Sequence, residues 1–252
     1  MHVVVTGASS GIGAAIARRF AEEGAKLTLV ARRRAKLEEL ASTMDGAHVV
    51  AHDLSEPAEA TSWIAEAQDA RGPIDVLVNN AGVQLISPTA SVDVERGEMS
   101  LRLNVFTPLR LTRAVLPGMI ERGRGAIVDI ASMAALAPTP CMTYYNASKG
   151  ALAAASEALR GELRGTGVHV VTVYPGIIPD TDMGELGLAA YQPSRMLAMQ
   201  PTGTPEKLAE LVVRAVDGKK PRVIYPTMNV FARWFPGPTR WLVDTFTPPL
   251  AR

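Results

Sequence analysis

A strand, a glycine-rich turn and a helix follow one another directly at the amino end of the chain. Residues 3–6 read Val-Val-Val-Thr, a β-branched run typical of a buried strand. The turn Gly7-Ala8-Ser9-Ser10-Gly11-Ile12-Gly13 comes next, and residues 14–23 have helical character. Unpaired N–H groups and the dipole of such a helix favour phosphate, and glycines permit its close approach. The segment predicts a dinucleotide pyrophosphate site, with an ordinary glycine-rich turn as the alternative.

Strand-like and helix-like segments alternate along the chain. The expected strands are near-continuous apolar runs at residues 2–6, 26–30, 47–51, 74–78, 125–130, 168–173 and 222–225. The expected helices are 12–23, 33–43, 57–71, 92–102, 105–122, 144–164 and 205–217. This alternation predicts an α/β fold with a single Rossmann-type domain over residues 1–225. We expect a doubly wound, seven-stranded parallel sheet with helices on both faces.

Charge and cysteine content exclude several classes of partner. Lysine and arginine number 26 against 25 acidic residues, so the net charge of +1 predicts neither nucleic acid nor an acidic partner. The single Cys141 excludes an intrachain disulfide and is typical of a reducing compartment. We expect no signal peptide, because the first strand starts at residue 3, and no membrane span. A cytoplasmic location is therefore expected, and no metal site is predicted.

A tyrosine and a lysine four residues apart indicate acid–base chemistry. Tyr145 and Lys149 share one face of the expected helix, and Ser132 stands thirteen residues before the tyrosine. A nearby cation lowers a tyrosine pKa from its usual value of about 10, which makes the pair a general acid/base. Such a pair suits proton transfer at a carbonyl or alcohol oxygen while hydride moves at carbon. Taken alone, this spacing also occurs by chance on surface helices.

Taken together, the motifs of this chain resemble those of the short-chain dehydrogenase/reductase family. They occur in the family's order and separation over residues 1 to about 225. They are Thr6–Gly13, Asp53-Leu54, Asn79-Asn80-Ala81-Gly82, Asn104, Ser132, Tyr145 with Lys149, and Pro175-Gly176. The resemblance implies an oxidoreductase that interconverts a ketone or aldehyde and an alcohol. The alternatives are a nucleotide-binding redox sensor or scaffold without turnover, and a 3-oxoacyl carrier-protein reductase.

The resemblance also implies four catalytic roles. Tyr145 exchanges the proton with the substrate oxygen, and Lys149 lowers the pKa of that phenol and bonds the nicotinamide ribose. Ser132 donates to the substrate oxygen, and Asn104 holds a water that links Lys149 to solvent. Tyr144 is expected to line the substrate pocket instead, because only Tyr145 has a lysine four residues on. The presence of all four residues favours an enzyme over a sensor.

The end of the second strand indicates which cofactor binds. Ala31 stands where NAD-binding relatives carry an aspartate, and Arg32 follows directly. A guanidinium matches a phosphate in charge and geometry, so the sequence predicts NADP(H), with Arg32 on the 2′-phosphate. Arg33 is the second candidate, Ser9 is expected to add a hydrogen bond, and a solvated helix start is the alternative for Arg32. Ser10 replaces the basic residue of some NADP-binding relatives.

The resemblance implies further cofactor contacts. The full predicted set is Gly7, Ser9, Ser10, Gly11, Ile12, Gly13, Arg32, Arg33, Asp53, Leu54, Asn79, Ala81, Gly82, Tyr145, Lys149, Pro175, Gly176, Ile178 and Thr181. Asp53 is expected at the adenine amine, with a helix cap as the alternative, and Asn79 is equally consistent with a structural role. Thr181 is expected at the nicotinamide amide, although it stands one residue later than usual.

The segment 177–203 is predicted to be a mobile substrate loop. Its methionines and leucines favour an apolar or bulky carbonyl compound, because methionine adapts to irregular ligands. The predicted substrate contacts are Met133, Cys141, Met142, Tyr144, Met183 and Leu186. Packing of these side chains on the body of the protein is the alternative.

Residues 226–252 form an aromatic and proline-rich tail that departs from the family's common short ending. This departure argues against the 3-oxoacyl carrier-protein reductase. The tail is expected to pack on the same domain or on a partner subunit, and a weak membrane-surface contact is the alternative. Pro236 and Pro238 are expected to break any long amphipathic helix there. By resemblance, helices 105–122 and 144–164 predict a homodimer or homotetramer.

Overall fold

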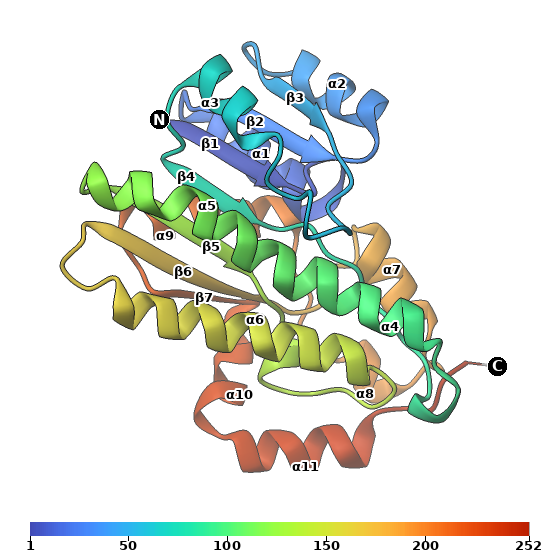
Figure 1. The fold of residues 1–252 in the computed structure, drawn as a ribbon. Coiled ribbons are helices and arrows are strands. Elements are labelled where there is room, and N and C mark those ends of the chain that lie inside the picture. Colours follow the sequence, from blue (N-terminus) through green and yellow to red (C-terminus); the bar gives the residue numbers. More distant parts are fainter. Residues whose placement is uncertain (252) are drawn as a thin grey trace.

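The computed structural model describes residues 1–251, apart from the side chain of Met196. A seven-stranded sheet with the order β3-β2-β1-β4-β5-β6-β7 lies at its centre, and every pairing is parallel (Figure 1). The strands are β1 (His2–Thr6), β2 (Lys26–Ala31), β3 (His48–Ala51), β4 (Val76–Asn79), β5 (Gly125–Ile130), β6 (Val168–Pro175) and β7 (Arg222–Tyr225). This arrangement confirms the predicted doubly wound fold.

Helices cover both faces of the sheet (Figure 1). They are α1 (Gly11–Glu22), α2 (Arg34–Ser42), α3 (Ile64–Arg71), α4 (Val94–Leu101), α5 (Thr107–Glu121), α6 (Thr143–Glu162), α7 (Asp182–Ala189), α8 (Arg195–Ala198), α9 (Pro205–Asp217), α10 (Val230–Trp234) and α11 (Pro236–Phe246). One hydrophobic cluster joins the sheet to α1, α2 and α9, and a second joins it to α3, α5 and α6. The layers are therefore helix, sheet and helix.

The first strand shows why the sequence specifies a sheet buried on both sides. Successive side chains of a strand point to opposite faces. Val3 and Val5 join the cluster under α1 and α9, Val4 joins the cluster under α3 and α5, and all three are fully buried. An unbroken apolar run is therefore what this position requires.

The predicted helix over 57–71 is shorter than expected. Only Ile64–Arg71 is α-helical, and residues 56–64 form turns in which several N–H groups bond three residues back, as from Ala60 to Pro57 at 3.4 Å. The segment 177–203, expected as a loop, contains the short helices α7 and α8. Their first turns are capped by the hydroxyls of Thr181 and Ser194.

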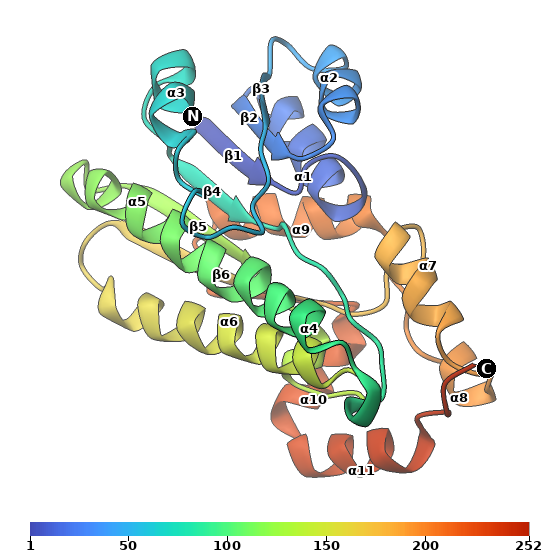
Figure 2. The ribbon, with the colours of Figure 1, turned by 45° about the vertical axis from the view of Figure 1, so that its right-hand side comes forward.

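The tail folds into two short helices that are separated at Phe235, so no long helix runs through Pro236, although Pro238 lies within the first turn of α11. Pro236 is the first residue of α11, where proline lacks only an N–H that would be unpaired anyway. Ala232 and Thr239 face the domain and are buried, while Trp234 is 70% and Trp241 59% exposed on the outer side. Figure 2 shows the chain ending beside α8. Within the described residues no helix is both long and apolar enough to cross a membrane.

Candidate active site

The predicted site residues gather at the carboxyl ends of the central strands. Gly7 follows β1, Gly82 follows β4, Ser132 follows β5, and Pro175 ends β6. In an open parallel sheet, this edge forms the ligand crevice where the strand order reverses. The topology therefore brings together motifs that lie up to about 170 residues apart in the sequence.

The glycine turn is shaped by close backbone contacts. Gly7 has a φ of +65°, and a Cβ there would lie 2.8 Å from the Cα of Ala81. A Cβ on Gly13 would collide with the carbonyl oxygen of Gly7. The side chain of Asn80 braces this turn by donating to the carbonyl oxygen of Thr6 at 2.9 Å and to that of Gly7 at 3.2 Å. The turn is thus a rigid cradle whose helix N-terminus fits a pyrophosphate.

Asn80 and Thr6 brace the glycine turn, a role that the sequence analysis did not predict for either residue. The Thr6 hydroxyl donates to the Val78 carbonyl and accepts the N–H groups of Asn80 and Ala81, at 3.0–3.1 Å. Asn79 is buried and donates to Asp129 at 2.8 Å and to Thr112 at 3.2 Å. Its side chain therefore has the structural role that was one of its two alternatives.

Tyr145 and Lys149 lie in the first turns of α6 and are only 5% and 4% exposed. The Lys149 ammonium donates to the carbonyl oxygen of Ile130 at 2.8 Å and lies 5.9 Å from the centre of the Tyr145 ring. Burial lowers the pKa of Lys149 to about 8, although the nearby Asp129 opposes this change. Holding the charged lysine beside the phenol therefore costs free energy, because the ammonium loses its contact with water.

Burial and a hydrogen bond act in opposite directions on the pKa of Tyr145. Burial raises the pKa of Tyr145 above its usual value, and a hydrogen bond with Ser132 opposes the rise. The Lys149 ammonium donates to the Ile130 carbonyl and lies 5.9 Å from the centre of the phenol ring, and its expected lowering of this pKa stays a prediction. A raised pKa keeps the phenol protonated at neutral pH.

Asn104 lies in a π-helical turn, Arg102–Phe106, between α4 and α5. Its side-chain oxygen accepts from the Val83 N–H, and its nitrogen donates to the Val83 carbonyl and to Ser148, all at 2.9 Å. Single π-helical turns occur often at functional sites. A Cβ on Gly82 would lie 3.0 Å from the Asn104 oxygen and 3.4 Å from the Lys149 nitrogen. The missing side chain at Gly82 therefore allows these two groups to converge.

Arg33, rather than Arg32, reaches the glycine turn. Its guanidinium donates to the hydroxyls of Ser9 at 2.9 Å and Ser10 at 2.8 Å. Arg32 is exposed and close enough to Asp53 to help lower the pKa of that carboxyl, which is lowered chiefly by the N–H of Ser55. Which of the two arginines meets a 2′-phosphate stays a prediction, and the structure brings Arg33 to the glycine turn.

The start of α7 lies across the crevice from the glycine turn. The Thr181 hydroxyl caps α7, and its methyl carbon lies 3.2 Å from where a Cβ on Gly11 would be. The sulfur of Met183 lies 3.9 Å from the Tyr145 hydroxyl oxygen. Ile178 is buried at the base of the same segment. The first residues of the segment 177–203 therefore lie against the glycine turn and Tyr145.

The predicted substrate contacts separate into two groups. Met142 is buried in a small cluster with Tyr145, and Met183 touches the same tyrosine. Leu186 instead points outward on α7 and is 70% exposed. The Tyr144 ring packs against α4, where a Cβ on Gly97 would lie 2.6 Å from it. Leu186 and Tyr144 are thus not brought to the phenol of Tyr145.

The other two predicted contacts lie near the two ends of the segment between β5 and α6. Met133 packs with Ala131 and Tyr174, and Cys141 is half-buried with its carbonyl accepting the Ser87 N–H at 2.8 Å. No three His, Cys, Asp or Glu side chains in residues 1–251 are grouped so that they could hold a metal ion.

This fold and site define an oxidoreductase of the nucleotide-binding α/β class. A family model described as short chain dehydrogenase matches residues 1–189, and the chain belongs to that family. It is 35% identical over 228 residues to "Ketoacyl reductase HetN" of Nostoc sp., covering 88% of this chain and 77% of that one.

Solved structures of other proteins have the same fold, and two of them contain a bound cofactor. The closed form of serine dehydrogenase complexed with NADP+ superposes with a TM-score of 0.78 and 32% identity, over 89% of this chain and 94% of that one. The 3-ketoacyl-(acyl-carrier-protein) reductase from Brucella melitensis, complexed with NADH, has a TM-score of 0.80 and 28% identity, over 89% and 96%. Family members therefore bind either nicotinamide dinucleotide.

Proposed function

We propose that the protein is an NADP(H)-dependent oxidoreductase that interconverts an apolar or bulky ketone or aldehyde and its alcohol. The observation that carries this proposal is the convergence of Tyr145, Lys149, Ser132 and Asn104 beside the rigid glycine cradle. A redox sensor or scaffold would need the cradle but not four acid–base residues in one place. The enzyme is therefore the better explanation of the site.

The reaction follows from the protonation states of these residues. Bound NADP(H) supplies or accepts the hydride. Tyr145, kept protonated by burial, gives its proton to the substrate oxygen during reduction, and Ser132 donates a hydrogen bond to the same oxygen. The Lys149 ammonium lies beside the phenol and balances the negative charge left on it. A positioned acid of this kind contributes roughly 10²–10⁴ in rate.

The preference for NADP(H) is supported by the charges at the end of β2. Ala31 provides no carboxylate to bond a ribose 2′-hydroxyl, and Arg33 presents its guanidinium between Ser9 and Ser10. Such a fork fits a phosphate at this position. We expect Arg33→Asp to lower the NADPH/NADH ratio of kcat/KM by at least about tenfold, which is about 1.4 kcal/mol. An equal effect of Arg32→Asp would assign the phosphate to both arginines, and indifference to both would contradict NADP(H) preference.

Catalytic turnover is tested by NADPH consumption against carbonyl compounds graded from small polar ketones to aryl ketones, steroids and 3-oxoacyl esters. Activity that rises with apolar size supports the proposal. We expect Tyr145→Phe to lower kcat by at least about 10²-fold, and Tyr225→Phe, which removes a hydroxyl at the edge of the sheet, to change it little. Tyr145→Phe with most of its activity would refute the mechanism. Preference for the 3-oxoacyl esters would favour the carrier-protein reductase suggested by the names of two relatives.

Homodimer formation is proposed through α5 and α6. A half-open groove of about 500 Å³ lies between these helices, with mainly apolar walls and the buried Asp129 among its lining residues. Leu109 and Ile120 are 42% and 41% exposed along its edge, as expected for a surface that a second helix pair covers. Sedimentation equilibrium tests this assembly.

The weak membrane-surface contact considered for the tail is supported by the exposed Trp234 and Trp241, and a vesicle flotation assay tests it.

A further inference from the structure

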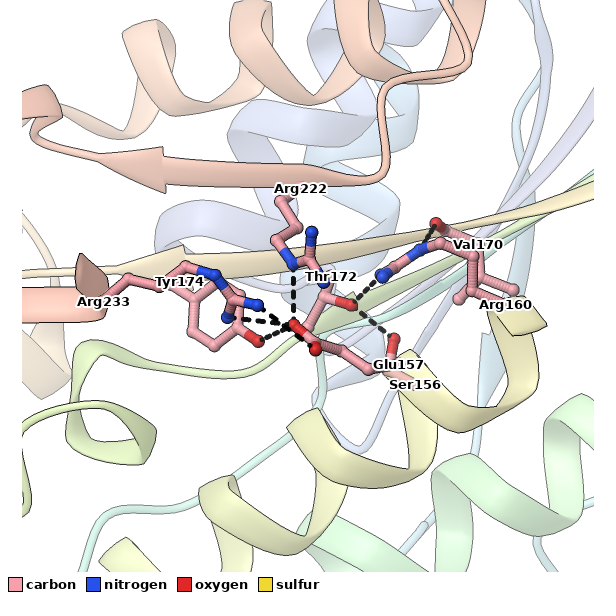
Figure 3. Close-up of polar contacts among 8 residues, drawn as sticks. All are labelled: Ser156, Glu157, Arg160, Val170, Thr172, Tyr174, Arg222 and Arg233. Carbon is pink, nitrogen blue, oxygen red and sulfur yellow. Dashed lines mark hydrogen bonds and ion pairs between the residues drawn. The ribbon is translucent and has the colours of Figure 1, made fainter. Parts of the chain in front are cut away.

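The tail is attached to the catalytic domain at both of its ends. Near its start, Arg233 of α10 donates to Glu157 of α6 at 3.1 Å (Figure 3). Glu157 also accepts from Arg222 of β7 at 2.7 Å and from the Tyr174 hydroxyl of β6 at 2.9 Å. These bonds lower the pKa of Glu157 to about 2, with the Arg222 bond contributing most. The beginning of the tail is thus fixed to the sheet.

The end of the tail pairs with the middle of the segment 177–203. The Gln192 N–H donates to the Pro249 carbonyl at 2.9 Å, and the Ala251 N–H donates to the Ala190 carbonyl at 2.9 Å. Tyr191 and Leu250 form an antiparallel bridge between these two bonds. Residues 249–251, called the strap from here on, therefore add one extended segment to the connection between α7 and α8.

Tyr191 ties the strap to the loop that precedes the catalytic helix. Its side chain is buried, and its hydroxyl donates to the Pro140 carbonyl at 2.7 Å. Burial raises the pKa of Tyr191 to about 12, so this hydroxyl remains a donor at neutral pH. Arg240 of α11 donates to the Pro138 carbonyl in the same loop. The tail therefore contacts both segments that flank Tyr145.

A single short helix, α7, connects the residues that pair with the strap to Met183, which contacts Tyr145. Helix α7 has eight residues and a length of about 12 Å, with Met183 in its first turn and the strap contact just beyond its last. The Met183 sulfur lies 3.9 Å from the Tyr145 hydroxyl, where the substrate oxygen must bind in the proposed reaction. The position of α7 thus decides how much space remains above that hydroxyl.

We propose that the strap and Tyr191 are positioning elements that hold Met183 over Tyr145 and so restrict the size of the substrate. This proposal rests on the proposed oxidoreductase function. A strap that only stabilised the fold would alter all substrates alike. A strap that positions Met183 alters the selectivity between small and bulky carbonyl compounds.

Selectivity measurements test the proposal directly. We expect deletion of residues 248–252 to raise the ratio of kcat/KM for a bulky aryl ketone over that for cyclohexanone at least about fivefold, mainly through KM. Met183→Ala should produce a similar rise, and the double variant should show little more than either change alone, because both act on one contact. Unchanged selectivity after deletion, or fully additive effects, would overturn the proposal.

Hydrogen exchange tests the attachment without any turnover, so it separates this proposal from the proposed function. We expect both the deletion and Tyr191→Phe to accelerate amide exchange in residues 182–192 by about tenfold or more, with exchange in α9 unchanged. Tyr225→Phe is the matched control. The Tyr225 hydroxyl accepts a hydrogen bond from the N–H of Thr204, which lies outside residues 182–192. Equal exchange of residues 182–192 in wild type and the deletion variant would refute the attachment, whatever the enzyme assays show.

Discussion

Replacing Lys149 by methionine is predicted to stabilise the protein while it removes catalysis. Lys149 is 4% exposed, and burial lowers its pKa from 10.5 to about 8. This difference corresponds to a destabilisation of about 3 kcal/mol at pH 7. Methionine fills a similar space without charge but gives up the hydrogen bond to Ile130, worth about 1 kcal/mol. The net gain of about 2 kcal/mol corresponds to a rise in Tm of roughly 4–8 °C.

The stabilisation expected from Lys149→Met depends on pH, because the charge on Lys149 depends on pH. Because the folded pKa of Lys149 lies below the unfolded value, the unfolded chain binds the extra proton between about pH 8 and pH 10.5. The cost of burying the charge is complete below pH 8 and is relieved as the pH rises through that window. At pH 9.5 about 1 kcal/mol of it remains, which is close to the value of the lost hydrogen bond. The difference in Tm should therefore nearly vanish there.

Thermal unfolding followed by circular dichroism at pH 7 and pH 9.5 measures both effects. Lys36→Met, which removes an exposed ammonium from α2, is the matched control and should shift Tm little at either pH. A Lys149→Met variant that melts below wild type at pH 7 would refute the reasoning. A difference that persists unchanged at pH 9.5 would refute the assigned cause.

Two further predictions concern the ion-pair cluster and the glycine cradle. Glu157→Gln should lower the free energy of unfolding by about 1–2 kcal/mol at pH 7, because a carboxylate bonded by two arginines is lost. Since its folded pKa of about 2 lies below 4.5, this contribution is complete above pH 4.5 and is lost as the pH falls toward 2. Urea unfolding at pH 7 and pH 3 should show the difference shrinking, and equal differences would contradict it. Gly13→Ala should abolish NADPH binding in calorimetry, because its Cβ has no room, whereas Gly161→Ala, which meets open space, should bind normally. Equal affinities would contradict the cradle.

The sheet and the cradle were predictable because each depends on neighbours in the sequence. A β-branched run before a glycine turn defines strand, turn and helix within about twenty residues. The spacing of Tyr145 and Lys149 likewise places both on one side of α6, as the structure confirms. The spacing does not predict how far the two side chains are exposed to solvent. Burial decides the pKa values of both residues, and burial depends on the whole fold.

The tail shows the opposite case, in which sequence patterns mislead because the deciding contacts are distant. The prolines predicted that no long helix forms, and the helix does break before Pro236, but the same proline also begins α11, which the sequence did not predict. The bond from Arg233 to Glu157 joins residues 76 positions apart, and the pairing of Gln192 with the tail joins residues 57 positions apart. Such pairings involve backbone groups or common charged residues, so no motif marks them. Their effect on the site nevertheless converges on Met183, which the sequence did single out. A residue that lies against Tyr145 can therefore be singled out by its type, while the elements that set its position must be found from the fold.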